Sequence, residues 1–210
     1  MNDMSMAYEQ TGRTGQKRRT RNELVAAARA LVARGVTVPT VEEAAAEASI
    51  SRTTAYRYFP NQKALLVAAH PEIETVSYLP AEAGPDPEER LLAVVKGFTQ
   101  MVVESEQQQR TMLRLSLEPD KAAHELPLRQ GRAIGWFEEA LAPLVPELGE
   151  TGVHGLAIAV RSAVGIESLV WLTDVAGLSR EQASEVMLWS AQALLHHALA
   201  DGIGRTLSIM

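Results

Sequence analysis

Residues 40–65 read TVEEAAAEASISRTTAYRYFPNQKAL, and this stretch decides the fold. Thr40 and Glu43 have the spacing of a capping box, in which each side chain satisfies a backbone N–H of the other residue. Ser51 is a second residue of the type that favours the N-cap position. The pattern therefore predicts two short helices, one that starts at Thr40 and one that starts at Ser51.

The ends of these helices are also marked. The second helix is expected to stop at Phe59, because the residue before a proline disfavours the α conformation. Asn61 then caps a further helix. Only a tight turn around Ser49 separates the first two helices, which is typical of a helix-turn-helix. In that motif the second helix of the pair enters the DNA major groove.

The composition of the second helix agrees with this interpretation. Residues 51–59 carry hydroxyl, guanidinium and phenol groups and no acidic side chain. The basic run at residues 16–21 precedes the motif. A short amphipathic surface helix is the alternative, but it would not account for the basic run, the caps and the turn together. A surface without carboxylates suits a polyanion.

Glycine and proline divide the chain into helix-length pieces, and no piece shows the alternation of a strand. We predict an all-α protein with nine helices. Residues 1–15 are expected to be a disordered tail, residues 16–70 a three-helix helix-turn-helix DNA-binding head, and residues 71–210 a larger helical body for ligand binding and dimerisation. Two long helices, at about 151–176 and 180–201, are expected to end the chain.

Charge is distributed unevenly along the chain. The formal net charge is −6, yet residues 1–60 hold nine Lys/Arg and six Asp/Glu, whereas residues 61–210 hold eleven and twenty. A basic end on an acidic body indicates an anionic partner at one end only. The longest apolar run, near Gly155, is far shorter than a bilayer span, and the first residues have no apolar leader. With no cysteine in the chain, we expect a cytoplasmic protein without a membrane partner.

No pattern in the chain predicts catalysis or a cofactor. The sequence has no His-Glu-x-x-His, phosphate-binding loop, dinucleotide fingerprint or Gly-x-Ser-x-Gly motif. The neighbouring His196 and His197 point about 100° apart on a helix and do not easily share a metal. We therefore expect no enzyme, no cofactor and no metal site.

Residues 40–65, and in particular Tyr56-Arg57-Tyr58-Phe59-Pro60-Asn61, closely resemble the tetracycline-repressor (TetR) family of bacterial transcription regulators. The resemblance covers about residues 16–70, and the remaining chain agrees only in length and in the number and order of helices. It implies an all-helical dimer that pairs through its last two long helices and binds a palindromic operator. It also implies, for most members, repression that a small ligand in the C-terminal domain relieves.

The resemblance also implies roles for individual residues. Thr40, Tyr56 and Tyr58 would contact phosphates, with Lys63 adding charge, and Phe59 would belong to the core. Arg52, Thr53 and Thr54 would read base edges, a role that is also open to Tyr56. The arginines at 18, 19 and 21 would contact phosphates or reach the minor groove. The full predicted DNA-binding set is Arg18, Arg19, Arg21, Thr40, Ser51, Arg52, Thr53, Thr54, Tyr56, Arg57, Tyr58 and Lys63.

The sequence departs from the usual family pattern at several positions. Ser49 stands where many members have glycine in the turn, so this serine must adopt the turn conformation without the freedom of glycine at positive φ, and Thr53 stands where glycine is frequent. Ala44 and Ala55 replace larger aliphatic residues. The lysine that contacts phosphate usually stands at position 62, but here Gln62 is followed by Lys63, so either residue can take that role.

The body gives weaker signals. Small and apolar residues on the last two long helices predict a dimer interface, with core packing inside one chain as the alternative, at Ala163, Val186, Met187, Ser190, Ala191, Leu194 and Ala198. Aromatic and methionine residues predict an apolar ligand cavity, with ordinary core packing as the alternative, at Phe98, Met101, Met112, Trp136, Phe137 and Trp171.

The expected function is a regulator, most simply a repressor, that binds operator DNA as a homodimer and is released by an unknown, apolar or weakly polar small molecule. Two alternatives stay open at this point. One is a DNA-binding regulator with a filled core that needs no ligand. The other is a helical binding module or enzyme that has lost DNA binding.

Overall fold

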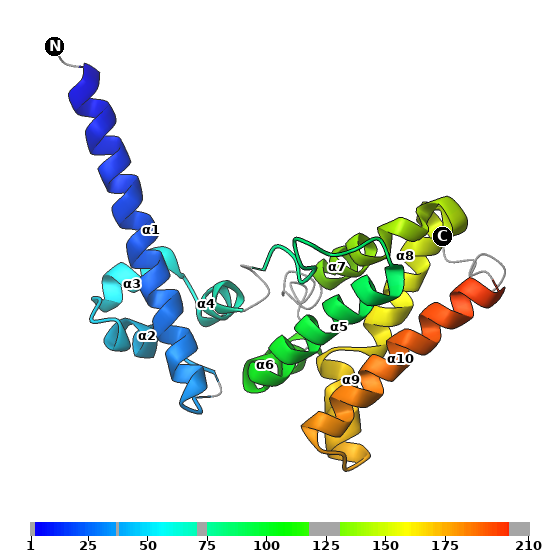
Figure 1. Ribbon diagram of the computed structural model, residues 1–210. Helices are drawn as coiled ribbons and strands as arrows, with labels where there is room; N and C mark the ends of the chain where they lie inside the picture. The colour runs from blue at the N-terminus through cyan, green and yellow to red at the C-terminus, as the bar shows by residue number, and fades with distance from the viewer. Residues whose placement is uncertain (1–2, 37, 71–74, 118–130, 202–210) are drawn as a thin grey trace. The chain divides into compact units, whose positions relative to one another are not determined.

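The structure is a computed structural model that describes residues 3–36, 38–70, 75–117 and 131–201, with side chains described from residue 15 onward (Figure 1). Every regular element in these ranges is helical, which confirms the predicted all-α class. The chain divides into two compact units, residues 1–73 and residues 74–210, and each has its own hydrophobic core.

The first unit contains four helices: α1 (Asp3–Ala33), α2 (Val41–Glu47), α3 (Arg52–Tyr58) and α4 (Gln62–Ala69). Helix α1 packs against α2 and α4, and α2 packs against α3. The core consists largely of alanine with a few larger residues, which lets these short helices approach closely. It includes Leu24, Ala28, Val41, Ala44, Ala55, Phe59 and Leu65.

Helix α1 is longer than the sequence predicts. It begins at Asp3, so the expected disordered tail at residues 1–15 is helical from that residue. No proline interrupts the segment, and it holds good helix formers, namely Met4, Met6, Ala7, Glu9 and Gln10, beside the weak helix formers Gly12 and Gly15.

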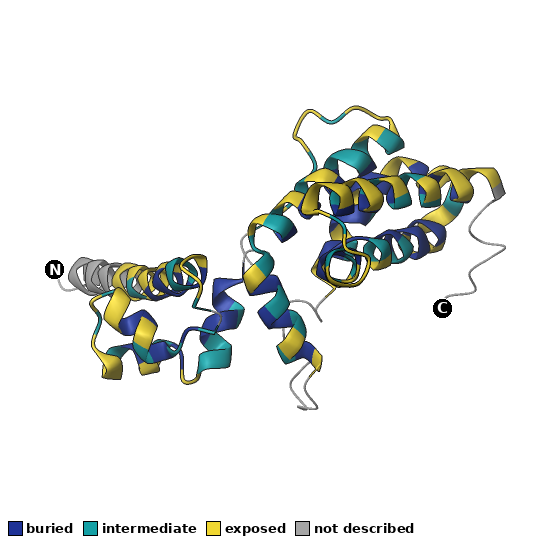
Figure 2. Cartoon of the chain, turned by 90° about the horizontal axis from the view of Figure 1, so that it is seen from below, coloured by how far each residue is buried: buried dark blue, intermediate teal, exposed yellow. Residues whose placement is uncertain are grey.

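The second unit is built around helix α5 (Pro87–Glu104), which packs against α7 (Arg132–Leu141) and α10 (Arg180–Asp201). Helix α8 (Val145–Ala163) covers both α7 and α10. The shorter elements are α6 (Glu106–Leu117), a 3₁₀ turn η4 (Ala142–Leu144), α9 (Ile166–Val170) and a π-helical turn η5 (Trp171–Val175). Figure 2 shows buried and exposed residues on the same helices, as expected for amphipathic helices around a core.

The long helix predicted at 151–176 is broken. Val164 is extended, and Gly165 has φ 115°, a value that favours glycine, before α9 begins. A Cβ atom at Gly165 would lie 2.7 Å from Nη1 of Arg161, and that guanidinium group donates to the Val164 carbonyl oxygen at 2.9 Å. The break therefore depends on a conformation and a close contact that hydrophobic periodicity does not reveal.

One stretch of the second unit, Arg132–Val175, has an 18-residue window with a mean hydropathy of 1.5, half of which is buried within the protein. The kink at Gly149 leaves residues 150–163 as the straight part of α8. That part is roughly 21 Å long, at 1.5 Å per residue. A bilayer core is about 30 Å thick. The apolar residues of this stretch accordingly form part of the core of the second unit.

Candidate nucleic-acid interface

Helix α3 is positioned by a strained turn. Ser49 has φ 55°, and among the described residues no other non-glycine residue has a positive φ. The turn is held because the Ile50 N–H donates to the Ala45 carbonyl oxygen at 2.8 Å. Ser51 then caps α3, and its Oγ accepts from the Thr54 N–H at 3.2 Å. The expected left-handed serine at position 49 and the expected cap are both confirmed.

The capping box of α2 is present as predicted. The Thr40 hydroxyl accepts from the Glu43 N–H at 3.1 Å, and the Thr40 N–H donates to Oε2 of Glu43 at 2.8 Å. The Gln62 side-chain amide also fastens this region, since Nε2 donates to the carbonyl oxygens of Val38 (2.9 Å) and Pro39 (3.3 Å). Gln62 therefore holds α4 against the chain that leads into α2.

The exposed face of α3 carries no carboxylate. Arg52, Thr53, Tyr56 and Arg57 are exposed, whereas Ala55 is buried on the opposite face. Phe59, at the end of α3, is 2% exposed and belongs to the core, as the sequence predicts. The structure thus brings guanidinium, hydroxyl and phenol groups together on one solvent-facing surface, and these are the side chains that most often contact bases and phosphates.

Glu42 on α2 organises this surface. Its Oε1 accepts a hydrogen bond from Nη2 of Arg52 and another from the Tyr56 hydroxyl, both at 2.6 Å. The Arg52 guanidinium carbon also lies 5.8 Å from the centroid of the Tyr56 ring. Together these contacts link two predicted DNA-contacting side chains to one carboxylate.

The contact shifts the ionisation of both partners. The hydrogen bond from Tyr56, with Arg52 nearby, holds the pKa of the Glu42 carboxyl below its ordinary value, so Glu42 is charged at neutral pH. The same hydrogen bond raises the pKa of the Tyr56 phenol. Sequence reasoning missed Glu42, and the helical spacing of α2 alone does not indicate that it faces α3.

The remaining predicted DNA-contacting residues lie on three helices or at their ends. Arg18, Arg19 and Arg21 are exposed on α1, and the Arg21 guanidinium carbon lies 5.3 Å from the centroid of the Phe59 ring. The others are exposed or half-buried: Thr40 and Ser51 as caps, Thr54 and Tyr58 on α3, and Lys63 on α4. The Thr40 hydroxyl is already used, because it donates to Glu43 at 2.9 Å.

Three of the residues predicted to line a ligand cavity pack together in the core of the second unit. Phe98, Trp136 and Phe137 are buried and pack on one another, with the Phe98 centroid 5.9 Å from that of Trp136 and 5.8 Å from that of Phe137. Met112 is buried and Met101 half-buried, whereas Trp171 is 59% exposed. Phe98 on α5 thus packs directly against Trp136 and Phe137 on α7.

The residues predicted to form the dimer interface occupy two faces of α10 and the end of α8. Met187, Ala191 and Ala198 are buried in the core of their own unit, so they are not accessible to a second copy in this fold. Val186 is exposed, and Ala163, Ser190 and Leu194 are half-buried. Sequence reasoning missed Trp189, which is 68% exposed.

Neither unit has a cluster of metal-binding side chains among its described residues. No three His, Asp or Glu side chains in the described ranges are arranged so that they could hold a metal ion. The titratable contacts include exposed pairs, such as His196 with Glu88 at 3.1 Å, and the less exposed Glu106, which pairs with Arg110 and Arg180. His124 lies outside the described residues.

The comparisons with known proteins agree with the geometry of the first unit. Residues 24–69 match the family model described as bacterial regulatory proteins of the tetR family. This match spans the end of α1 and the whole of α2, α3 and α4. No curated protein matches the chain. The description names regulatory proteins and not enzymes, as the sequence predicts. Residues 24–69 therefore form the helix-turn-helix DNA-binding domain of the tetR family of bacterial regulatory proteins, and this domain supports a DNA-binding transcriptional regulator.

Proposed function

We propose that the protein is a cytoplasmic repressor that binds a palindromic operator as a homodimer and is released by a small molecule bound in residues 74–210. The observation that carries the proposal is the exposed face of α3, which presents Arg52, Thr53 and Tyr56 without any carboxylate of its own. A helix of this kind fits the major groove, where arginine commonly pairs with guanine.

The proposed contacts fall into two groups. Arg52, Thr53 and Thr54 would read base edges, and the other predicted residues of the head would contact phosphates. Lys63 is the better phosphate partner in α4, because the Gln62 amide already donates to two backbone carbonyl groups while lysine carries a positive charge. The exposed arginines at residues 18–21 would add contacts to the phosphates or reach the minor groove.

The homodimer is supported by exposed apolar side chains on α10. Val186 and Trp189 are 37% and 68% exposed, and Ala193 continues the same stripe at helical spacing. Large exposed apolar residues of this kind are typical of protein interfaces. A two-fold dimer through this face would present two α3 helices, which must enter successive major grooves roughly 34 Å apart.

A ligand-independent repressor is the second candidate. The packing of Phe98, Trp136 and Phe137 favours it, because these aromatic residues contact one another in the core, as in ordinary core packing. A ligand that relieves repression must then bind elsewhere in the second unit, and it must favour one arrangement of the two heads over another.

The test compares Arg52→Ala with Lys63→Ala. Fluorescence anisotropy would measure binding to a duplex selected by the wild-type protein and to a random duplex, over about 50 to 200 mM salt. Loss of Arg52 should relax base preference at one position per half-site, at a cost of about 1–3 kcal/mol there. Loss of Lys63 should weaken both duplexes alike and reduce the salt slope by about 1.

Two results would contradict the proposal. An affinity that does not change with salt would exclude phosphate binding by the head. Equal weakening of both duplexes by both variants would show that Arg52 does not read bases. Sedimentation analysis of the same samples would test the dimer, since a monomer that binds the palindrome at wild-type strength is incompatible with the proposed mechanism.

A further inference from the structure

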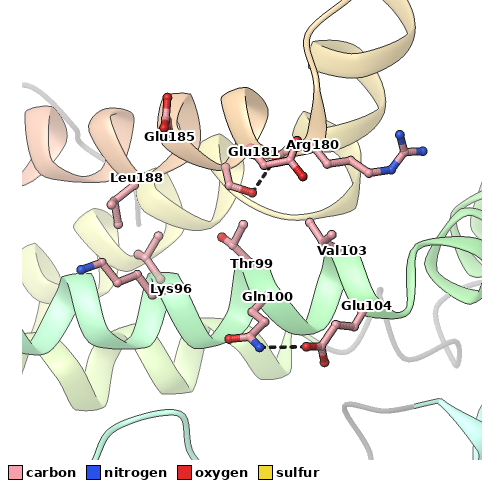
Figure 3. Close-up of a pocket in the computed structure, with 11 residues that line it drawn as sticks. Lys96, Thr99, Gln100, Val103, Glu104, Arg180, Glu181, Glu185 and Leu188 are labelled. Atoms are coloured by element: carbon pink, nitrogen blue, oxygen red, sulfur yellow. Dashed lines mark hydrogen bonds between the residues drawn. The ribbon is translucent and has the colours of Figure 1, made fainter.

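A groove of about 430 Å³ lies between α5 and α10 in the second unit (Figure 3). Its volume is in the range of small-molecule sites, about 300–1,000 Å³. Figure 3 shows Thr99, Val103 and Leu188 directed into the space between the two helices. The groove lies away from the packed aromatic residues of α5 and α7, and none of the residues predicted to bind a ligand lines it.

Thr99 supplies a polar group in the groove that a ligand could bind. It is 5% exposed, and its Oγ1 is buried without a hydrogen-bond partner. Threonines in helices commonly donate to the carbonyl oxygen four residues earlier, as Thr111 does to Gln107 at 3.0 Å. Leaving a buried hydroxyl unpaired is unfavourable, so a ligand atom that bonds to Thr99 would recover that loss.

The charged residues around the groove favour a cation. The lining includes three carboxylates, those of Glu104, Glu181 and Glu185. It also includes two cationic side chains, but the Arg180 guanidinium is bound to Glu106, with Nε to Oε2 at 2.6 Å and Nη2 to Oε1 at 3.1 Å. Apart from that pair, the lining holds one cationic side chain, Lys96, and three carboxylates, of which Glu104 accepts from Nε2 of Gln100 at 2.8 Å, so the rim of the groove is net negative.

The lining beneath these charges is apolar. Val95, Val103 and Leu188 contribute methyl groups from both helices. A ligand that fits must therefore combine an apolar body with a positively charged group that can donate a hydrogen bond. A carboxylate or phosphate would meet the three glutamates and be repelled, and a neutral hydrocarbon would leave Thr99 unpaired.

We propose that the groove between α5 and α10 binds a small organic cation, a primary or secondary ammonium group on an apolar body. The ammonium group donates to Thr99 Oγ1 and lies near Glu181, and the apolar body packs on Val103 and Leu188. The cation would be the effector of the proposed function, so its regulatory role rests on that function. Binding of the cation to the groove does not depend on it.

The first experiment uses three probes with one apolar body. Isothermal titration calorimetry would compare 4-phenylbutylamine, which is protonated at neutral pH, with 4-phenylbutanol and 4-phenylbutanoate on the full chain without DNA. The amine is expected to bind more tightly than the alcohol, and the carboxylate is expected not to bind. Equal binding of all three probes, or no binding of the amine at millimolar concentration, would overturn the proposal.

The second experiment locates the site with variants. Thr99→Val should weaken amine binding about fivefold, and Thr99→Ser, which keeps the hydroxyl, should restore it. Glu181→Gln should weaken binding about threefold. Glu150→Gln, an exposed change on α8 outside the groove, is the matched control and should leave the affinity unchanged.

Thermal unfolding of each variant shows whether a change in amine affinity comes from the site or from loss of the fold. Thr99→Val removes a buried unpaired hydroxyl, so its melting temperature should not fall, and weaker binding cannot be blamed on misfolding. Wild-type amine affinity in both Thr99→Val and Glu181→Gln would refute the site. If the protein binds DNA but not the amine, only this inference is refuted. If it binds the amine but not DNA, only the proposed function is refuted.

Discussion

Replacing Phe59 with alanine should unfold the DNA-binding unit and leave the second unit intact. Phe59 ends α3 and is 2% exposed, and it packs in a core that is otherwise mostly alanine and leucine. The Arg21 guanidinium carbon lies 5.3 Å from its ring centroid, which links α1 to the end of α3. Few other side chains in this small core are as large, so its neighbours cannot fill the space that it leaves.

The size of the effect can be compared with the stability of the unit. A buried Phe→Ala change typically costs about 3–5 kcal/mol. A domain of about 55 residues has a total stability of roughly 3–8 kcal/mol, at 0.05–0.15 kcal/mol per residue. At the midpoints of these two ranges, about 4 and about 5.5 kcal/mol, the substitution removes roughly three quarters of the stability of the first unit. The second unit has a separate core and should keep its own unfolding transition.

The measurement is thermal unfolding followed by circular dichroism, together with limited proteolysis and DNA binding. Phe59→Ala should lose the transition of the first unit and lose DNA binding. Phe59→Leu, which keeps most of the volume, should cost about 1.5 kcal/mol or less and retain binding. If Phe59→Ala lost DNA binding with both transitions unchanged, the ring would be a DNA contact and the core assignment would be refuted.

Three further outcomes are expected. Glu42→Gln should raise affinity for random DNA about twofold to fivefold, because it removes a negative charge beside the phosphates. It should also reduce base discrimination, because Arg52 loses its carboxylate partner. Fluorescence anisotropy with selected and random duplexes measures both affinities, and an unchanged ratio of the two would contradict this role of Glu42. The hydrogen bonds from Arg110 lower the pKa of Asp174 to about 2, so this contact stabilises the second unit at neutral pH and is lost as the pH falls from about 4 to 2. Asp174→Asn should flatten that part of the stability curve in acid titrations followed by circular dichroism, and an identical curve would argue against the contact. Trp189→Glu should give a folded monomer by sedimentation, because the side chain is largely exposed; a variant that stays dimeric would place the interface elsewhere.

The sequence by itself determined the features that depend on neighbouring residues. The caps at Thr40, Ser51 and Asn61 are all present, because a capping side chain bonds to a backbone N–H only three residues away. The helix-turn-helix follows from these caps and from the turn at Ser49, whose positive φ the sequence also indicated. Residues of this motif supported the family assignment.

Tertiary structure decided the features that join distant residues. Glu42 meets Arg52 and Tyr56 across two helices, and helical periodicity on α2 does not show which helix a half-buried glutamate faces. The sequence of α10 likewise does not show which apolar residues face the core. Met187 is buried in its own unit, whereas Trp189 is exposed.

The groove between α5 and α10 has the same origin. Thr99 and Glu181 come from helices far apart in the chain, and only the packing of these helices places both on one cavity. Local hydrogen bonds determine where a helix begins, and these can be read from neighbouring residues. The direction in which each face points is set by the summed burial of many side chains, so it emerges only when the whole unit packs.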